Sequence, residues 1–321
     1  MPTSFTKSFD DFVTSTLDLY TQTSFQNNVF DDIPLFKWLT AKGRAVPAAG
    51  GNEILEPIMI STNGTAKSYA AYEDLDVTPS DAGTGAFFPW ARYAVTVAIS
   101  GDERDRNTGK QAIVDLFQGK MEQAEMSMSD LMSQDLFSTK AGTDGKSLIG
   151  LRAMIATDPT TVSVGRVATS ETAWRNQKDT NSYTFSSAGE AKWELMLDLC
   201  KNHGTMPDLI VTTQTIKQKY SDILRSRGVH AVSGLQVGDS TFKTLEFAGI
   251  PVLDDRDCPA NMVFFLTSKR LKYRYNPNRH FKLTEAKTPA NKDATYWQII
   301  ERCQLTTNDR SVLGVCSGTV S

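Results

Sequence analysis

Residues 86–138, AFFPWARYAVTVAISGDERDRNTGKQAIVDLFQGKMEQAEMSMSDLMSQDLFS, join an aromatic-rich segment to a long amphipathic one. From Tyr93 to Ile99, β-branched or aromatic residues alternate with other residues, and this period of two predicts a strand. Ser100 ends the strand, and Glu103 follows at the spacing that caps a short helical turn reciprocally. The junction carries no nucleophile, metal-ligand set or phosphate loop. It therefore favours a subunit that contacts copies of itself over an enzyme.

A long helix is expected over about 108–138, with Thr108 as a second N-cap. Apolar residues recur there at intervals of three and four and form a narrow stripe roughly 40 Å long. The stripe contains Ile113, Leu116, Phe117, Met121, Ala124, Met128, Leu131, Met132 and Leu136. Methionine adapts to irregular contacts, so the stripe could be a docking groove, but such a pattern is more often a core-facing helix.

Composition limits the class of protein. The chain has 321 residues, of which 40% are hydrophobic and 22% are charged, so we expect a folded protein that is not membrane-like. The N-terminus lacks a signal-peptide pattern, which predicts a protein made and kept in a cytosol. A net charge of -3 argues against nucleic-acid binding by bulk attraction. The excess of acidic residues lies in a loop-like region, which either contacts other copies of the chain or is simply exposed to solvent. The acidic residues are Glu53, Glu56, Glu73, Asp74, Asp76 and Asp81.

The four cysteines, Cys200, Cys258, Cys303 and Cys316, form no C-x-x-C pair and do not cluster with the three histidines. Zinc is therefore not expected, and in a reducing compartment the cysteines should be free thiols. Cys303 and Cys316 flank a turn and could approach across a hairpin, but a disulfide there is disfavoured.

Two N-terminal segments cannot form a core alone. Residues 1–44 read as an arm with an amphipathic helix that needs a partner surface within the subunit or on a neighbour. Residues 45–92 read as a two-stranded flap with a strand from Ile54 to Ile60, in which Pro57 favours an edge position. Asn63-Gly64 predicts the hairpin turn of this flap.

The C-terminal half alternates between helical and strand patterns. Helices are expected at 188–203 and 215–225, and the last strands, at 297–305 and 311–316, are expected to form a terminal hairpin. Short strands are expected between these segments, at 209–212, 244–247, 251–253, 262–267 and 269–275.

Motifs for chemistry are weak. Gly142–Ser147 resembles the end of a phosphate loop, but its glycines are too close together and it follows a helix. Asp254, Asp255 and Asp257 could bind a divalent cation, although a solvated turn is the better interpretation. A basic run with interleaved tyrosines suits either nucleic acid or an acidic neighbour: Lys269, Arg270, Lys272, Arg274, Arg279, His280 and Lys282.

The order of these elements resembles the major capsid proteins of tailed double-stranded DNA bacteriophages, the Hong Kong 97-like fold. Three segments carry the likeness: AFFPWARYAVTVAISGDERDRNTGKQAIVDLFQ, GLRAMIATDPTTVSVGRVATSETAW and MPDLIVTTQTIKQKY. The resemblance implies an α+β fold with an arm at 1–44 and an extended β-loop at 45–92. It further implies a peripheral domain at 93–186 that contains the spine helix, an axial domain at 187–270, and return strands at 271–321 that complete both domains.

The resemblance also implies a function. Such proteins assemble with themselves into pentamers and hexamers of an icosahedral head that encloses double-stranded DNA non-specifically. Implied partners are a scaffolding protein, a portal and, as a further option, a decoration protein. No membrane partner, cofactor, metal or catalytic residue is implied. The expected place is the virion capsid, after assembly in the host cytoplasm.

Contacts between subunits are expected to be electrostatic. The flap residues Lys67, Glu73, Asp74 and Asp76 should lie near a neighbour, with Arg104 and Arg106 or with Lys272 and Arg274 as the basic side. Two other classes stay open: a cytosolic α/β enzyme with a β-flap lid, and a nucleic-acid-coating protein. Electron microscopy should separate shells from a small oligomer, and a coating protein should show steeply salt-dependent DNA binding.

Overall fold

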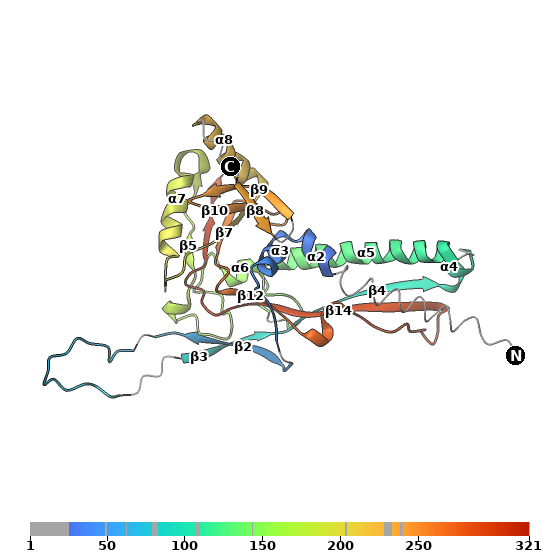
Figure 1. The fold of residues 1–321 in the computed structure, drawn as a ribbon, viewed down its shortest axis with the longest axis horizontal. Helices are drawn as coiled ribbons and strands as arrows, with labels where there is room; N and C mark the ends of the chain where they lie inside the picture. Colours follow the sequence, from blue (N-terminus) through green and yellow to red (C-terminus); the bar gives the residue numbers. More distant parts are fainter. Residues whose placement is uncertain are drawn as a thin grey trace.

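The computed structural model describes residues 26–48, 50–61, 63–78, 83–106, 110–142, 144–202, 204–227, 233–237 and 240–320. Figure 1 shows three parts: a long body of helix and sheet, an upright α/β part, and a hairpin that projects from their junction. The α+β class expected from the sequence is confirmed by this arrangement.

The body is built on a five-stranded sheet with the order β1-β12-β14-β13, in which β4 also pairs with β14. Its longest ladder is antiparallel and runs from Ala91 opposite Cys303 to Ser100 opposite Ala294. The strands are β1 (Ala45–Pro47), β4 (Ala91–Ser100), β12 (Leu271–Tyr275), β13 (Lys282–Leu283) and β14 (Ala294–Thr307). The expected strand at Tyr93 to Ile99 is therefore confirmed, and its partner strand lies near the end of the chain.

The capping arrangement after β4 is also confirmed. The Ser100 backbone N–H donates to Glu103 Oε2 at 3.1 Å, and the Glu103 N–H donates to Ser100 Oγ at 3.2 Å. This pair begins the short helix α4 (Gly101–Arg106), which precedes the 27-residue helix α5 (Lys110–Leu136). The second cap expected at Thr108 lies outside the described residues.

One face of α5 packs on the body, as the stripe predicts. Met121, Ala124, Met128, Met132 and Leu136 are buried. The prediction was wrong for Leu131, which is 46% exposed, because it lies beside the stripe and not within it. Leu116 and Phe117 are half-buried at the end of the helix nearer α4, while the side chain of Ile113 lies outside the described residues.

Helices α2 (Gln26–Asp32) and α3 (Pro34–Ala41) belong to the body and not to a free arm. Val29, Ile33, Phe36 and Leu39 are almost fully buried in the main core. Phe30 and Phe36 contact the ring of Tyr273 on β12 at 5.6 and 4.9 Å between centroids. These two helices therefore find their partner surface within the subunit, while the arm boundary at residue 44 stays a prediction and the helix expected earlier in the chain lies outside the described residues.

The upright part holds a seven-stranded sheet with the order β5-β15-β11-β7-β10-β9-β8. One face of this sheet joins the main core and the other packs under α7 (Phe185–Leu199) and α8 (Gln214–Ser226). Burial on both faces explains the continuous apolar run of β7. The strands are β5 (Gln177–Asp179), β7 (Leu209–Thr212), β8 (Ser233–Val237), β9 (Ser240–Phe247), β10 (Ile250–Asp254), β11 (Met262–Leu266) and β15 (Gly314–Ser317).

Short elements connect these parts. They are α6 (Leu151–Met154), η2 (Thr172–Trp174), η3 (Pro277–Arg279) and the pair β6 (Tyr183–Thr184) and β16 (Thr319–Val320). The expected terminal hairpin is wrong, because β14 belongs to the five-stranded sheet while β15 pairs with β11 and β5. The four cysteines are buried free thiols, as expected.

Candidate functional site

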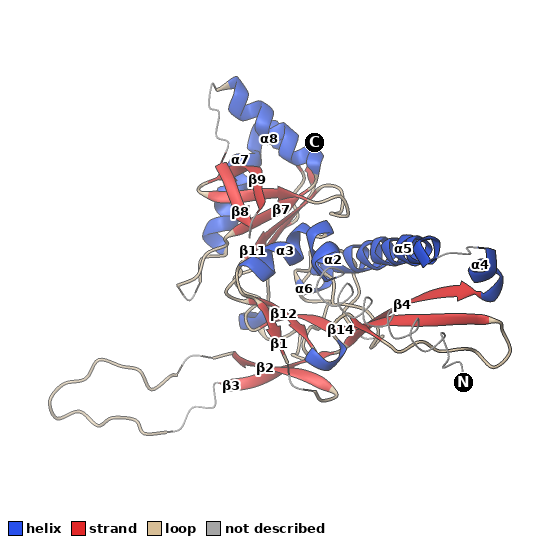
Figure 2. Ribbon diagram, turned by 45° about the vertical axis from the view of Figure 1, so that its right-hand side comes forward, coloured by secondary structure: helices blue, strands red, loops and turns tan. Residues whose placement is uncertain are grey.

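The projecting hairpin consists of β2 (Glu53–Met59) and β3 (Gly83–Pro89), which form a separate two-stranded sheet within the described part of the chain. It leaves the body as a narrow ribbon and continues into a long loop (Figure 2). Met59 pairs with Gly83, so the loop begins at residue 60. Asn63-Gly64 therefore makes a turn within the loop and does not close the hairpin, contrary to expectation.

The two faces of the hairpin differ in burial. Ile54, Ile58 and Phe88 face inward and are buried in the main core. On the other face, Leu55 is 58% exposed and Met59 is 81% exposed. Phe87 pairs with Leu55 across the ribbon and is 40% exposed. The hairpin thus presents a continuous apolar face away from its own subunit.

A buried carboxylate attaches the inward face to the body. Glu56 is 1% exposed, and its Oε2 accepts a hydrogen bond from Lys272 Nζ at 2.9 Å. Its Oε1 accepts from Arg274 Nε at 2.7 Å and from Thr306 Oγ1 at 3.2 Å. Burial alone would raise the pKa of Glu56, but the hydrogen bonds from Arg274 and Lys272 and their positive charges outweigh it and lower the pKa.

This attachment changes the expected role of two basic residues. Lys272 and Arg274, one of two basic pairs expected near the acidic flap of a neighbouring subunit, bind the flap residue Glu56 of their own chain, and the contact between subunits stays a prediction. The prediction paired the right kinds of residue. It missed the intrachain contact because the approach of β2 to the remote strand β12 depends on tertiary structure.

Further polar contacts hold the base of the hairpin. The Gly51 carbonyl accepts from Trp90 Nε1 at 3.1 Å and from Arg302 Nη2 at 2.7 Å. The Arg302 guanidinium also lies 4.7 Å from the centre of the Trp90 ring. The Phe87 N–H donates to the Gly165 carbonyl at 2.9 Å, which joins β3 to the segment after α5.

The loop beyond the hairpin is exposed and its hydrogen bonds are local. Lys67 Nζ donates to Glu73 Oε1 at 2.8 Å and to the Asp74 carbonyl at 2.7 Å. The hydroxyl of Thr78 donates to Asp76 Oδ1 at 2.5 Å. Lys67 therefore stabilises the loop of its own chain, and Glu73, Asp74 and Asp76 are exposed at the surface. Exposed apolar side chains accompany them: Tyr69, Tyr72, Leu75 and Val77.

Arg104 and Arg106 lie on α4, at the end of the body opposite the loop (Figures 1 and 2). The positions of their side chains lie outside the described part of the chain. The acidic loop and α4 of one subunit are too widely separated along the long axis to meet each other, and the expected contact with a neighbour stays a prediction.

The acidic run at the end of β10, Asp254, Asp255 and Asp257, makes hydrogen bonds with other residues of the same chain. Asp254 accepts from Lys217 Nζ at 2.5 Å, and Asp257 accepts from Ser133 Oγ at 2.5 Å. Burial and the nearby Asp257 and Asp254 raise the pKa of Asp255 to about 6. Among the residues that the structure describes, no group of three or more potential ligands could hold a metal ion. The divalent-cation alternative thus gains no support here.

Two further members of the basic run lie near carboxylates of the same chain. His280 Nδ1 lies 3.0 Å from both oxygens of Glu301, a fully buried residue that also accepts from the Tyr273 hydroxyl at 3.0 Å. Arg270 lies near Asp309 at 4.0 Å.

Within the described residues, no helix is long and apolar enough to cross a lipid bilayer.

Comparison with solved structures identifies the fold. The structure is similar to the capsid asymmetric unit of cyanophage A-1(L), with a TM-score of 0.63, 14% identity, and coverage of 89% of this chain and 93% of that one. The capsid of a native GTA particle gives a TM-score of 0.55 at 13% identity, covering 88% and 90% of the two chains.

The same fold is shared by an encapsulin. The holo-SrpI encapsulin complex from Synechococcus elongatus PCC 7942 gives a TM-score of 0.54 at 12% identity, with 88% and 87% of the chains covered. The fold alone therefore does not separate these two kinds of protein. No curated protein matches the sequence.

The sequence resolves the difference. Residues 94–318 match the family model of the SU10 major capsid protein. This range begins within β4 and ends after β15, so it contains helix α5, the seven-stranded sheet and most of the five-stranded sheet, but neither β1 nor the hairpin. With most of the chain matched and a Hong Kong 97-like capsid fold around it, the protein belongs to the SU10 major capsid protein family and is a structural subunit of a tailed-phage capsid.

Proposed function

We propose that the hairpin and its loop join neighbouring subunits of the shell, with the outward apolar face of β2 and β3 as the principal contact. The exposed apolar side chains carry this proposal. More than half of the large exposed apolar residues in the described chain lie between Leu55 and Phe87. Three of them lie on the outward face of the ribbon and the others lie in the loop. A two-stranded ribbon is also marginal without a partner.

The occupant of this face is a second copy of the chain. The protein is a shell subunit, so each hairpin is repeated beside a neighbour. Because the loop and α4 lie at opposite ends of the long axis, a contact between them is head-to-tail. Head-to-tail contacts close into rings when the rotation between copies permits it. Pentamers and hexamers of an icosahedral head are such rings.

Charge supports the same arrangement. Glu73, Asp74 and Asp76 are exposed on the loop, and their expected partners in a neighbour are Arg104 and Arg106. Lys67 is paired with Glu73 within the loop and shapes the acidic surface. Each exposed pair contributes only about 0.2–1 kcal/mol. Burial of the apolar face therefore supplies most of the binding free energy, while charge selects the register.

The remaining partners follow from the capsid role. We infer that the five-stranded body is the peripheral domain and the seven-stranded part is the axial domain. The shell encloses double-stranded DNA without sequence preference. A scaffolding protein, a portal and a decoration protein act beside it, and assembly takes place in the host cytoplasm. The protein has no catalytic step in this role. An enzyme lid is less well supported, since the charged groups beneath the hairpin are paired with one another.

Substitution of the apolar face tests the proposal. The variant Leu55→Ser/Met59→Ser/Phe87→Ser should remain a folded subunit but form no closed particles in negative-stain electron microscopy. The matched control, Met126→Ser/Leu131→Ser, changes exposed apolar residues of α5 and should assemble normally. Closed particles from the hairpin variant, in the parent's yield, would show that this face is not the contact.

A further inference from the structure

Glu56 occupies an unusual place for a carboxylate. It alternates with Ile54 and Ile58 on the inward face of β2, so the pattern places it where the core needs an apolar side chain. It is nevertheless 1% exposed. A buried charge is costly unless it is paired and fully hydrogen-bonded, and both conditions are met here by residues of the body.

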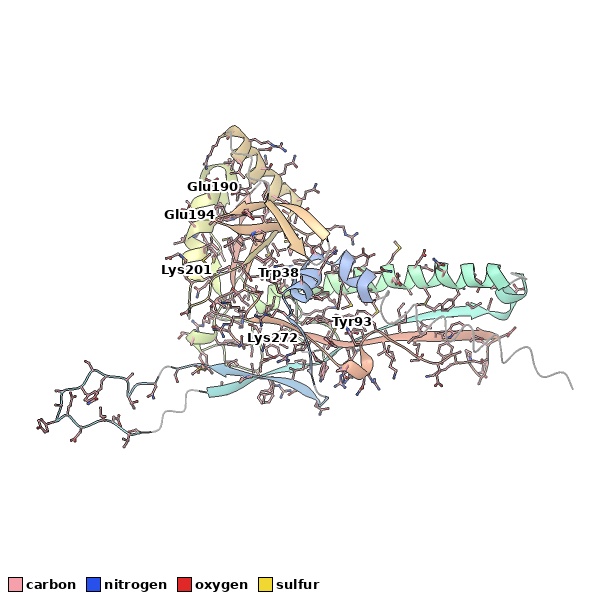
Figure 3. The ribbon with its side chains drawn as sticks, in the orientation of Figure 1. Trp38, Tyr93, Glu190, Glu194, Lys201 and Lys272 are labelled. Carbon is pink, nitrogen blue, oxygen red and sulfur yellow. The ribbon has the colours of Figure 1, made fainter. Side chains whose placement is uncertain are left out.

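The contacts constrain direction as well as position. Lys272 and Arg274 are two residues apart on β12, so their side chains emerge on the same face of the sheet. Each binds a different oxygen of Glu56, and Thr306 on the adjacent strand β14 binds one of them as well. Figure 3 marks Lys272 at the junction between the hairpin and the body. Charge-assisted hydrogen bonds have definite geometry, whereas apolar packing is non-directional.

The ladder weakens immediately beyond this anchor. The next rung pairs Pro57, which has no N–H to donate, with Gly85, which has no side chain to pack. A Cβ added to Gly85 would lie 2.4 Å from Leu55 Cδ1, so the glycine leaves room for the side chain of Leu55. Beyond this rung, Ile58 is again buried in the main core, so Glu56 lies between two apolar contacts of β2 with the body.

We propose that Glu56 is a positioning residue that sets the angle at which the hairpin leaves the body, acting beside the apolar contacts of Ile54 and Ile58 with the main core. The assembly consequence of this inference rests on the proposed function of the hairpin. Replacing a buried ion pair by apolar residues is often neutral for stability. The charged cluster therefore orients the hairpin, and it adds little to the free energy of unfolding.

Spin-label distances on the full-length protein test the angle directly. The native cysteines are buried, so labels attach selectively to cysteines introduced at the exposed residues Met59 and Met126. The labels then report the distance between the hairpin and α5 by double electron–electron resonance. In Glu56→Gln, which keeps the size but removes the charge, the distance distribution should broaden at least about twofold. The yield of closed particles from unlabelled Glu56→Gln should fall roughly tenfold.

A second variant guards against simple unfolding. Glu56→Met/Lys272→Met/Arg274→Met removes all three charges and should melt close to the parent while keeping the broad distribution. The matched control is Glu53→Gln, because Glu53 pairs with Arg166 at the hairpin base without belonging to the buried cluster. It should leave the distribution unchanged. A parent-like distribution in the triple methionine variant would overturn the proposal.

The two proposals fail separately. If the apolar-face variant assembles normally while Glu56→Gln broadens the distribution, the positioning role stands and the hairpin contact does not. If the distribution stays narrow in both Glu56 variants while the apolar-face variant fails to assemble, the hairpin contact stands and Glu56 has no positioning role.

Discussion

Helix α5 and the hairpin use similar apolar residues for opposite purposes. Met132 and Leu136 on α5 are fully buried within their own subunit, whereas Met59 on the hairpin is 81% exposed. The helix has the body on one side and solvent on the other, so its stripe is satisfied within the chain. The hairpin is a ribbon with two apolar faces and only one of them meets the body. Apolar surface that the subunit cannot bury indicates where another copy belongs.

Their polar anchors differ in the same way. On the body, the Tyr93 hydroxyl donates to Asp135 Oδ2 at 2.8 Å and accepts from the Leu148 N–H at 2.9 Å, linking β4 to the end of α5. Tyr93 lies in the main core, and Asp135 Oδ1 also accepts from Lys140 Nζ at 2.6 Å. On the hairpin, Glu56 is itself a buried charge with two basic partners, so loss of its charge should leave Lys272 and Arg274 without their carboxylate.

The largest effect is expected from a charge in the buried stripe. Met132→Asp should cost roughly 3–5 kcal/mol and yield insoluble subunit, because an unpaired carboxylate would be buried against the body. Its neighbour Leu131 is the matched control, and Leu131→Asp should stay within about 1 kcal/mol of the parent. Soluble expression and chemical denaturation measure both. An equal loss of stability in the two variants would contradict the assignment of Met132 to the buried face of α5 and of Leu131 to the exposed face.

Removal of the loop should abolish assembly and spare the fold. Replacing residues 60–82 by Asn-Gly joins the paired residues Met59 and Gly83 through a two-residue hairpin turn. The melting temperature of the subunit should change by less than about 2 °C, because the inward face of the hairpin is kept. Closed particles should be absent in electron microscopy. A length-preserving variant with Tyr72→Ser and Val77→Ser separates loop length from apolar content.

A smaller, pH-dependent effect is expected at Asp255, which lies at the junction of the upright part with α5. Its pKa is raised from 3.8 to about 6, so the neutral carboxyl is favoured in the fold. The associated stability is fully present below about pH 4 and is lost as the pH rises through about 6. Asp255→Asn should therefore stabilise the subunit by roughly 1–3 kcal/mol above pH 7 and have little effect near pH 4.

Denaturant titrations of the dissociated subunit at both pH values measure this difference. The control is Asp254→Asn, which removes a partner of Lys217 at a more exposed position and should lower stability slightly at neutral pH. A gain from Asp255→Asn that is the same at both pH values would contradict the assignment to ionisation of this carboxyl.

The smallest effect concerns the acidic loop. Glu73→Lys/Asp74→Lys/Asp76→Lys should weaken assembly while leaving subunit melting nearly unchanged, and parent assembly should weaken as salt rises. Adding Arg104→Glu/Arg106→Glu should restore part of the assembly yield, measured by light scattering. An equal loss of melting temperature in the loop variant would place these acids within the subunit's own fold.

Local sequence patterns were sufficient to predict several elements of secondary structure. Alternation from Tyr93 to Ile99, the Ser100–Glu103 cap and the methionine stripe of α5 all follow from neighbours within a few residues. The family resemblance also came from this order of elements. Such features are predictable because strand period, capping and helix periodicity depend on short sequence separations.

Only the tertiary structure decided which part of the molecule each of these elements packs against. Residues 26–41 fill the main core because β12 offers Tyr273 as a partner surface, and the strands on either side of Asp309 separate into different sheets. Leu55 and Ile54 are adjacent and both apolar, so composition could not tell which one points outward. Likewise, Glu56 reads as a solvated acid until the fold brings β2 against β12. The contact between Glu56 and Lys272 spans 216 residues of sequence and depends on how the sheets pack, and no local period records it.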